Sequence, residues 1–492
     1  MAKNGMKRNS GRPAKRRHKT TKTSPSISMN VEEDGFSKLP DAVIVHILSF
    51  LPTVDVVRTC LLSKRWKLMW YSVPTLYFSE TGFRWPSNEE KFFYNYVDNY
   101  LKHRKRGMNF TVDSAITSFK LQMRSYYEIN KATRIDKWLD FAVKNKVKEL
   151  NVWLNDDCDG DNFYFYPLPK SVFNSRHLAI LELGNLDLST GSYSIRLPAL
   201  KTLLVNTVLF INDDVLFNLS LGCPSLEKLL LHSCDIMNGP FRLQSLSLKV
   251  LEVEYDDFAS PLQLEVTNLE SLVVHRYIFE GTNLSACKAI RNLSLTFDWS
   301  IRKLEDPSLP LEDLISNLPL LESLTLEECA RVNLKQIKIS NQQLKSLNLK
   351  NMYADRDYGM TVIIESAPKL ASFSYEGNIK FGISMESFNS LDGKFVIHNL
   401  RENCDANEFI GMMNFLLNLN CSWSIITLHV LSDKVLIVPE NLKRICPLSS
   451  LNWKHLRVKT DKKPESESNL KDALMWISPT LETLCINEIV IF

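Results

Sequence analysis

The stretch Leu226-Glu-Lys-Leu229-Leu-Leu231-His-Ser-Cys234 decides the fold of this 492-residue chain. It follows the pattern L-x-x-L-x-L, with a cysteine three positions after the last leucine. Side chains alternate along an extended strand, so Leu229 and Leu231 point to one side and the residue between them points to the other. We therefore expect a short strand with a leucine face that must be buried against another part of the chain.

The same pattern returns along the chain, for example in Leu321-Glu-Ser-Leu324-Thr-Leu326-Glu-Glu-Cys329, and successive copies start 21 to 31 residues apart. This spacing is typical of leucine-rich repeats. One coil cannot bury its own leucines, so neighbouring coils stack and their strands form a parallel sheet. We predict an α/β solenoid with copies starting at Leu178, Leu200, Leu226, Leu248, Leu269, Ile290, Leu321, Leu344 and Leu370, and later copies at Leu456 and Leu481.

The cysteines fit a structural role in this pattern. Cys234 and Cys329 stand where the chain turns away from the sheet, and a small apolar residue is suited to that position. The ten cysteines form no CxxC pair and show no zinc-ligand spacing, which favours a reducing compartment.

Upstream of the repeats, residues 36–79 have a different pattern. Apolar residues at three- and four-residue spacing after Leu39-Pro40 predict a helix that ends at Pro52. Thr53 and Ser63 are candidate N-caps of a second and a third helix, the second bearing Val56, Val57, Cys60 and Leu61. Three short helices make a very small core, and such a unit usually needs a partner to bury its remaining apolar surface.

These residues carry a family resemblance. The run from Leu39 to Pro52, then Val57-Arg-Thr-Cys-Leu-Leu-Ser-Lys-Arg-Trp66 and Trp70, closely resembles the F-box of plant proteins. The resemblance implies a three-helix F-box that docks onto a Skp-type adaptor and, through it, a cullin. It places the adaptor contacts at Leu39, Pro40, Ile44, Ile47, Leu48, Leu51, Pro52, Leu62 and Trp66. Packing of the three helices against each other is the alternative role, and Ile47, Leu48 and Trp66 are expected to serve both.

The whole chain divides into five parts on this reading. A helix over Thr133 to Val143 is predicted in the third part, and the fifth resembles the C-terminal extension called the FBD region of plant F-box repeat proteins, apart from a polar insertion at residues 462–468. The parts are a disordered basic tail (1–34), the F-box (35–80), a helical linker region (81–146), the leucine-rich repeats (147–380), and irregular repeats with the FBD-like region (381–492).

The basic tail concentrates charge, because residues 1–22 hold nine Lys or Arg and no acid. Without these nine, 50 of the 59 basic residues remain against 56 acidic ones, so the body lacks the positive charge of a nucleic-acid groove. The tail is interpreted as a nuclear-import signal or as a solvated extension. We expect the nucleus, the cytoplasm or both, and no nucleic-acid partner.

Other site classes have little support in the sequence. The first 30 residues do not form a signal peptide, and no stretch reads as a membrane span. Asn155-Asp-Asp157-Cys-Asp159-Gly160 imitates half a calcium loop, but Tyr166 occupies the position of the bidentate Glu. No phosphate-binding, zinc-protease or nucleophile-elbow motif occurs. We therefore predict a non-enzymatic chain with no catalytic residue, cofactor or metal.

The strand register also predicts a binding face. Leu204, Leu230 and Val273 take the outward middle position of their strands, beside the acidic residues Glu182, Glu252 and Glu254. Outward apolar residues indicate a partner, and Leu204, Leu230, Glu252 and Val273 are the predicted substrate contacts. The alternative is that a loop or the C-terminal region folds over them.

The leading hypothesis is a substrate-recruiting subunit of an SCF-type ubiquitin ligase, in which the F-box holds the ligase and the repeats hold a protein substrate. One rival is a receptor for a hormone-like small molecule on the same scaffold. Another is a repeat scaffold without ligase activity. The sequence leaves open the identity of the substrate, any need for a ligand or phosphorylation, the oligomeric state and the pathway.

Overall fold

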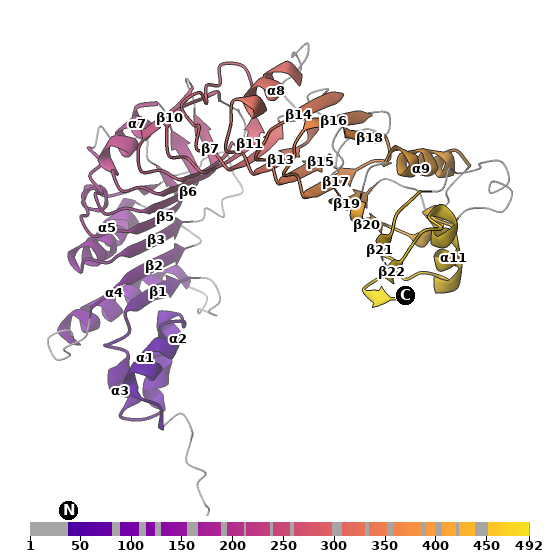
Figure 1. Ribbon diagram of the computed structural model, residues 1–492. Helices are drawn as coiled ribbons and strands as arrows, with labels where there is room; N and C mark the ends of the chain where they lie inside the picture. The colour runs from indigo at the N-terminus through magenta and orange to yellow at the C-terminus, as the bar shows by residue number, and fades with distance from the viewer. Residues whose placement is uncertain are drawn as a thin grey trace, which may run out of the picture.

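The computed structural model forms an arch, with strands along its inner side and helices along its outer side (Figure 1). It describes residues 38–80, 89–107, 115–123, 129–154, 166–187, 194–210, 213–236, 240–255, 260–297, 308–329, 334–351, 359–385, 390–398, 406–419, 423–437 and 451–491. The predicted basic tail and the calcium-like stretch from Asn155 to Gly160 lie outside these residues. No described helix is long and apolar enough to cross a membrane.

A large sheet follows the inner side of the arch, which we call the concave face. Sixteen of its strands pair in parallel, each with the next. They are β1 (Thr75–Ser79), β2 (Ser118–Met123), β3 (Glu149–Leu154), β5 (Ile180–Asp187), β6 (Thr202–Phe210), β7 (Lys228–Ile236), β9 (Val250–Glu254), β11 (Ser271–Tyr277), β12 (Asn292–Phe297), β13 (Ser323–Glu327), β15 (Ser346–Lys350), β17 (Ser372–Gly377), β19 (Leu391–Ile397), β20 (Trp423–Val430), β21 (His455–Thr460) and β22 (Thr483–Ile486). β4 (Tyr166–Pro167) and the antiparallel β23 (Ile489–Val490) complete it.

The outer side is built from helices and two small parallel sheets (Figure 1). The small sheets are β8 (Phe241–Ser245) with β10 (Leu262–Val266), and β14 (Gln336–Ser340) with β16 (Met360–Ser366) and β18 (Phe381–Met385). The helices after β1 are α4 (Glu89–Gly107), α5 (Ile129–Lys144), α6 (Lys170–Phe173), α7 (Asp213–Gly222), α8 (Ser308–Ser316), α9 (Ala406–Asn418), the 3-10 turn η4 (Asp433–Val435) and α11 (Glu467–Ile477).

Stacked leucines form the core of the solenoid. Leu229 on β7 pairs with Leu203 on one side and Leu251 on the other, and all three are buried. Leu324 and Leu347 occupy the same position on later strands, pair with each other and are also buried. Burying a leucine completely contributes about 1.5–3 kcal/mol, so the ladder is the main stabilising feature of the arch. The leucine-rich-repeat fold predicted from the sequence is confirmed.

The parallel sheet starts earlier than the sequence pattern indicated, because β1 and β2 both precede residue 147, β1 pairs with β2, and β2 pairs with β3. Leu76 and Phe78 are buried at alternate positions, but their segment lacks the leading leucine of a repeat. The predicted helix over Thr133–Val143 lies within α5, with Trp138 buried. Near the C-terminus Leu456 pairs with Leu484, so Trp453, not Leu456, takes the first position of its repeat. The polar residues 462–468 lead into α11, whose N-cap is Ser466.

The N-terminal helical unit, residues 38–73, lies beyond β1 at one end of the arch (Figure 1). It contains α1 (Asp41–Leu48), α2 (Thr53–Arg58), the 3-10 turn η2 (Thr59–Leu61) and α3 (Trp66–Met69). Pro52, not Thr53, takes the N-cap position of α2, and the Thr53 hydroxyl instead accepts a hydrogen bond from the backbone N of Tyr77 at 2.7 Å. Arg65, not Ser63, takes the N-cap position of α3, although the Ser63 hydroxyl still accepts a hydrogen bond from the backbone N of Trp66 at 3.3 Å.

A buried arginine joins this unit to the solenoid. Arg104, on α4, has no exposed surface and donates hydrogen bonds to the carbonyl of Trp70 and, at 2.9 Å, to that of Val73. The ring of Trp70 lies 5.0 Å from that of Tyr100, between centroids. Gly107 ends α4 against Tyr71, whose ring is 2.0 Å from the place where a Cβ would stand. The helical unit is therefore docked on α4 and β1.

Alternating charges line the edge of the sheet where the strands begin. The charged side chains belong to the residue that follows the first apolar residue of each repeat, and we call them the charge ladder. Glu322 shows the geometry, because one carboxylate oxygen lies 2.6 Å from a nitrogen of Arg291 and the other lies 2.6 Å from a nitrogen of Lys345. Lys201 and Lys249 flank Glu227 in the same way, at 3.2 and 3.7 Å. The ladder consists of Lys201, Glu227, Lys249, Glu270, Arg291, Glu322 and Lys345.

Replacing Glu322 by Gln is expected to reduce solenoid stability at pH 7 and low salt, and to have a smaller effect near pH 3. The donors on Lys345 and Arg291 lower the pKa of Glu322 below the ordinary value of about 4.3. A depressed folded-state pKa stabilises the fold above the unfolded-state pKa, and this stabilisation is lost as the pH falls through the folded-state value. Urea midpoints at the two pH values measure the difference.

Glu270→Gln is the matched control, since Glu270 occupies the same repeat position without an ion pair among the described residues. An equal loss of stability at both pH values for Glu322→Gln would show that the carboxylate charge is not responsible.

Candidate interaction surfaces

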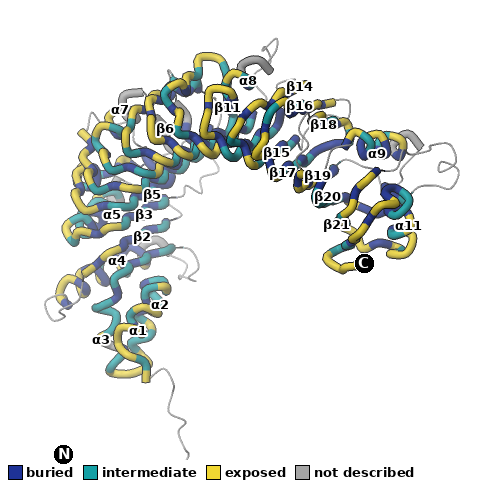
Figure 2. The backbone as a smooth tube through the Cα atoms, viewed as in Figure 1, coloured by how far each residue is buried: buried dark blue, intermediate teal, exposed yellow. Residues whose placement is uncertain are grey.

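The N-terminal helical unit exposes far more apolar surface than its size would suggest. Six of the fourteen large apolar residues found exposed in the described part of the chain lie between residues 43 and 68. Figure 2 shows exposed stretches of chain around α1 and α3 in this unit. An exposed set of this kind marks a binding surface. We call these six residues the apolar set: Val43, Ile47, Phe50, Leu61, Leu62 and Leu68.

The nine predicted adaptor contacts fall into three groups. Ile44, Leu48 and Trp66 are buried together with Val56 and Val73, so they form the core of the unit and the expectation that they offer contact surface needs correction. Ile44 and Leu48 lie four residues apart on one side of α1, and Trp66 at the start of α3 joins them in the buried cluster. The exposed contacts are Pro40, Ile47 and Leu62, and the partly buried ones are Leu39, Leu51 and Pro52.

Four members of the apolar set were not predicted as contacts. Leu61 was expected on the second helix, but α2 ends at Arg58 and the chain tightens into η2. The tighter turn rotates Leu61 outward, where it is 89% exposed. Val43 lies on α1 and Phe50 lies two residues after its end. The signal available for Phe50 was a large apolar residue shortly before Pro52 that the helical pattern did not use. Leu68 lies on α3 and is also exposed.

The concave face has the predicted register. Leu204 lies beside Glu182 and Leu230, and Glu252 lies between Leu230 and Val273. Leu204, Glu252 and Val273 are partly exposed, as expected of outward positions. Leu230 is the exception, because only 8% of its surface is exposed. It stands mid-sheet between the side chains of Leu204 and Glu252, so the expectation of an open contact at Leu230 is corrected.

Polar pairs occupy the concave face around this apolar centre. The ring Nε2 of His232 lies 3.1 Å from an oxygen of Glu252, and Asn151 donates to the carboxylate of Glu182. Further along, His398 Nε2 lies 2.9 Å from an oxygen of Glu376. These cross-strand pairs fix the side chains, so the face presents ordered acceptors to a partner.

A cavity of about 740 Å³ joins the helical unit to the first strands of the concave face. Phe50 from the unit lines it with Tyr77 on β1 and Trp153 on β3. The indole of Trp153 lies across Gly184, where a Cβ would come within 2.5 Å of the ring. Sequence reasoning missed this part of the face because β1 and β2 were assigned to other regions. The alternation Leu76-Tyr-Phe78 was the signal that indicated a strand.

The cysteines of the repeats are structural. Cys329 is buried, and burial raises the pKa of its thiol well above the ordinary range. Burial likewise raises the pKa of Cys223 to about 12. Cys234 is buried and its Sγ lies 3.2 Å from the carbonyl of His232. A thiol with a raised pKa is a poor nucleophile at neutral pH.

Comparisons with known proteins match two parts of this architecture. Residues 36–77 match the F-box domain, and residues 135–296 match a family model described as FBD-associated F-box protein At5g56370, LRR repeats. The first match covers the N-terminal helical unit, and the second covers the strands from β3 to β12.

Curated relatives from Arabidopsis thaliana have the same combination in their names. An FBD-associated F-box protein is 29% identical over 53% of this chain and 54% of its own length, and an F-box/FBD/LRR-repeat protein is 32% identical over 46% and 49%. An F-box protein is 25% identical over 70% of this chain and 73% of its own length. The chain thus spans about half the length of the first two relatives. Residues 36–77 are therefore similar to the F-box domain, and residues 135–296 to the leucine-rich repeats of FBD-associated F-box proteins.

Proposed function

We propose that this chain is the substrate-recognition subunit of an SCF-type ubiquitin ligase. The observation that carries the proposal is that the F-box exposes the apolar set. A joint held by Arg104 connects this F-box to a long concave sheet, so the chain has two separate surfaces for two partners. F-box domains generally bind a Skp-type adaptor, and six exposed apolar residues on so small a unit provide a surface for one. A cullin would join through that adaptor.

The proposed chemistry is proximity and not catalysis by this chain. A substrate held on the concave face would be kept near the ubiquitin carrier, which raises the effective concentration of its lysines. The docking of Trp70 and Val73 onto Arg104 supports this, because a fixed joint limits the volume that the substrate explores. Co-purification of the chain with a Skp-type adaptor and a cullin tests the assembly. Absence of both from the purified complex would contradict the proposal.

The substrate surface is proposed at Leu204 and Val273, with Glu252 between their strands. Replacing Leu204 and Val273 together by Glu is expected to stop substrate capture, because two partly exposed apolar anchors become charged. The fold and adaptor binding should persist, since neither side chain lies in the leucine core. Quantitative proteomics of cells that carry the variant measures capture, because the substrate should accumulate as it does when the chain is absent.

Leu246→Glu is the control for this experiment, because Leu246 is 76% exposed and lies at the strand-start edge. A substrate that is still degraded with the double variant would exclude this part of the concave face. Leu230 is left unchanged in the test, since a Glu at this buried position would destabilise the sheet.

We propose a nuclear location because of the basic residues in 1–22, a segment that lies outside the described residues. Nine positive charges without an acid are typical of an import signal. Deleting residues 1–22 from a fluorescent fusion should shift the protein toward the cytoplasm. An unchanged distribution in live-cell imaging would leave the tail without this role.

A further inference from the structure

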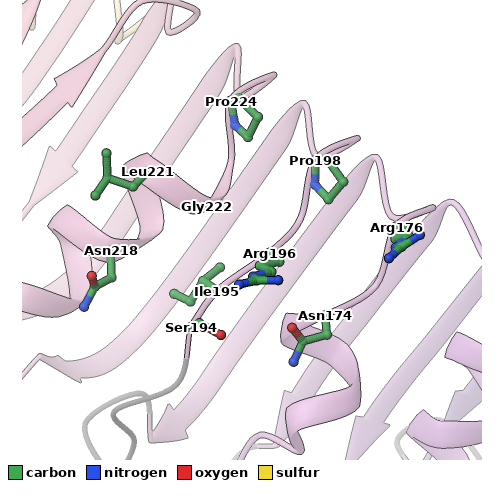
Figure 3. Close-up of a pocket in the computed structure, with 10 residues that line it drawn as sticks. All are labelled: Asn174, Arg176, Ser194, Ile195, Arg196, Pro198, Asn218, Leu221, Gly222 and Pro224. Atoms are coloured by element: carbon green, nitrogen blue, oxygen red, sulfur yellow. The ribbon is translucent and has the colours of Figure 1, made fainter.

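A second pocket, away from the concave face, is lined by arginines. It has a volume of about 580 Å³ and is formed by three successive coils where the chain returns toward β5, β6 and β7 (Figure 3). Asn174 and Arg176 come from the first coil, Arg196 from the second, and Asn218 and Gly222 from α7 in the third. We call it the arginine pocket.

The charge of this pocket is uncompensated. Arg176 and Arg196 are both exposed, and neither has an ion pair or a side-chain hydrogen bond among the described residues. Among the described residues that line the cavity there is no carboxylate, whereas Asn174, Ser194 and Asn218 add polar groups. The charge ladder on the same solenoid differs, because Arg291 there is neutralised by Glu322 at 2.6 Å.

The backbone that carries Arg196 is fixed on both sides. Its own N–H donates to the carbonyl of Phe173 at 2.8 Å, and the next N–H, from Leu197, donates to the carbonyl of Gly222 at 2.9 Å. Glycine is required at position 222, since a Cβ would lie 2.1 Å from the carbonyl oxygen of Ile195. The backbone on this side of the pocket is therefore set before a ligand arrives, which lowers the entropy lost on binding.

Neutralisation of a helix end does not explain both arginines. Positive side chains are favoured at a helix C-terminus, and α7 ends at Gly222 beside Arg196. The carbonyl of Gly222 is already satisfied by Leu197, and Arg176 lies after α6, a helix of only four residues with a small dipole. Two unpaired guanidinium groups on neighbouring coils remain to be matched by a ligand.

We propose that the arginine pocket binds a phosphate monoester. A guanidinium group donates two parallel hydrogen bonds to phosphate oxygens, and a phosphate monoester carries about −1.5 to −2 charge at pH 7. The two positive charges of Arg176 and Arg196 balance that negative charge. A ligand with a single carboxylate would leave one of the two arginines without a matching charge. The site goes beyond the proposed ligase function and does not depend on it.

Titration calorimetry on the full chain with phenyl phosphate and with benzoate tests the assignment. Saturable binding of phenyl phosphate is expected, at least tenfold tighter than benzoate, and it should weaken as the pH falls below the second phosphate pKa of about 6. Arg176→Gln with Arg196→Gln should lose the binding with an unchanged melting temperature, because both side chains are exposed. Arg291→Gln is the matched control, and each single variant should lose part of the affinity.

Undiminished binding by the double variant, benzoate binding as tight as phenyl phosphate, or no saturation at about 10 mM ligand would each overturn the proposal. A serine-phosphorylated peptide and inorganic phosphate distinguish the source of the group. Tighter binding of the peptide identifies a phosphorylated protein, equal binding shows that the phosphate group alone is recognised, as in any small phosphate ester, and both results support the site.

Discussion

Leu61→Lys combined with Leu62→Lys is expected to abolish binding of a Skp-type adaptor and to leave the chain folded. Both side chains project into solvent, with 89% and 68% of their surface exposed, so lysine costs little in the free chain. In a complex, each lysine would place a charge where an apolar anchor is expected. Losing such anchors costs about 2 kcal/mol or more each, roughly a thirtyfold loss of affinity per residue.

Surface plasmon resonance with purified adaptor measures this loss, and circular dichroism confirms the fold. Leu246→Lys with Leu320→Lys is the matched control, because both residues are exposed leucines outside the F-box. Adaptor binding equal to that of the unchanged chain would remove the apolar set from the proposed interface. Leu48 is unsuitable for such a test, since it is 1% exposed and a lysine there would unfold the unit.

The strand register could be predicted from the sequence because side chains alternate between the two faces of a strand, so the buried residues determine which residues face outward. Once Leu229 and Leu231 must be buried, Leu230 and His232 have to face outward, and the pairing of β7 with β6 agrees. Burial of Leu230 could not be predicted in the same way, because it depends on the size of Leu204 and Glu252 on the neighbouring strands.

The candidate sites were harder to predict than the fold. The helical pattern placed Leu61 on the second helix, whereas in the structure the chain changes to 3-10 geometry at Thr59 and Leu61 is 89% exposed. Arg176 and Arg196 lie between regular elements, where no periodicity relates them, and they meet only because their coils stack. Predictions based on period therefore hold for the leucine ladder and fail where the local turn geometry or the stacking of coils decides which side chains meet.

Arg104→Met is expected to release the F-box from the solenoid while each part keeps its own core. The substitution removes donors from the carbonyls of Trp70 and Val73, and a buried acceptor without a partner costs about 1–3 kcal/mol. We expect a loss of about 2–4 kcal/mol, confined to the joint. The leucine ladder and the cluster around Ile44 and Leu48 do not include Arg104.

Hydrogen exchange followed by mass spectrometry measures this release, with faster exchange expected for residues 70–79 than for β7 or β12. Arg104→Lys is the matched variant: its single ammonium keeps the charge but lacks the fork that reaches two carbonyls, so an intermediate effect is expected. Adaptor binding should survive in both variants, because Leu61 and Leu62 remain exposed. Ubiquitin transfer to a captured substrate should fall, since a loose joint enlarges the volume that the substrate explores. Unchanged exchange at residues 70–79 in Arg104→Met would show that Tyr71 against Gly107 and Thr53 against Tyr77 are sufficient to hold the joint.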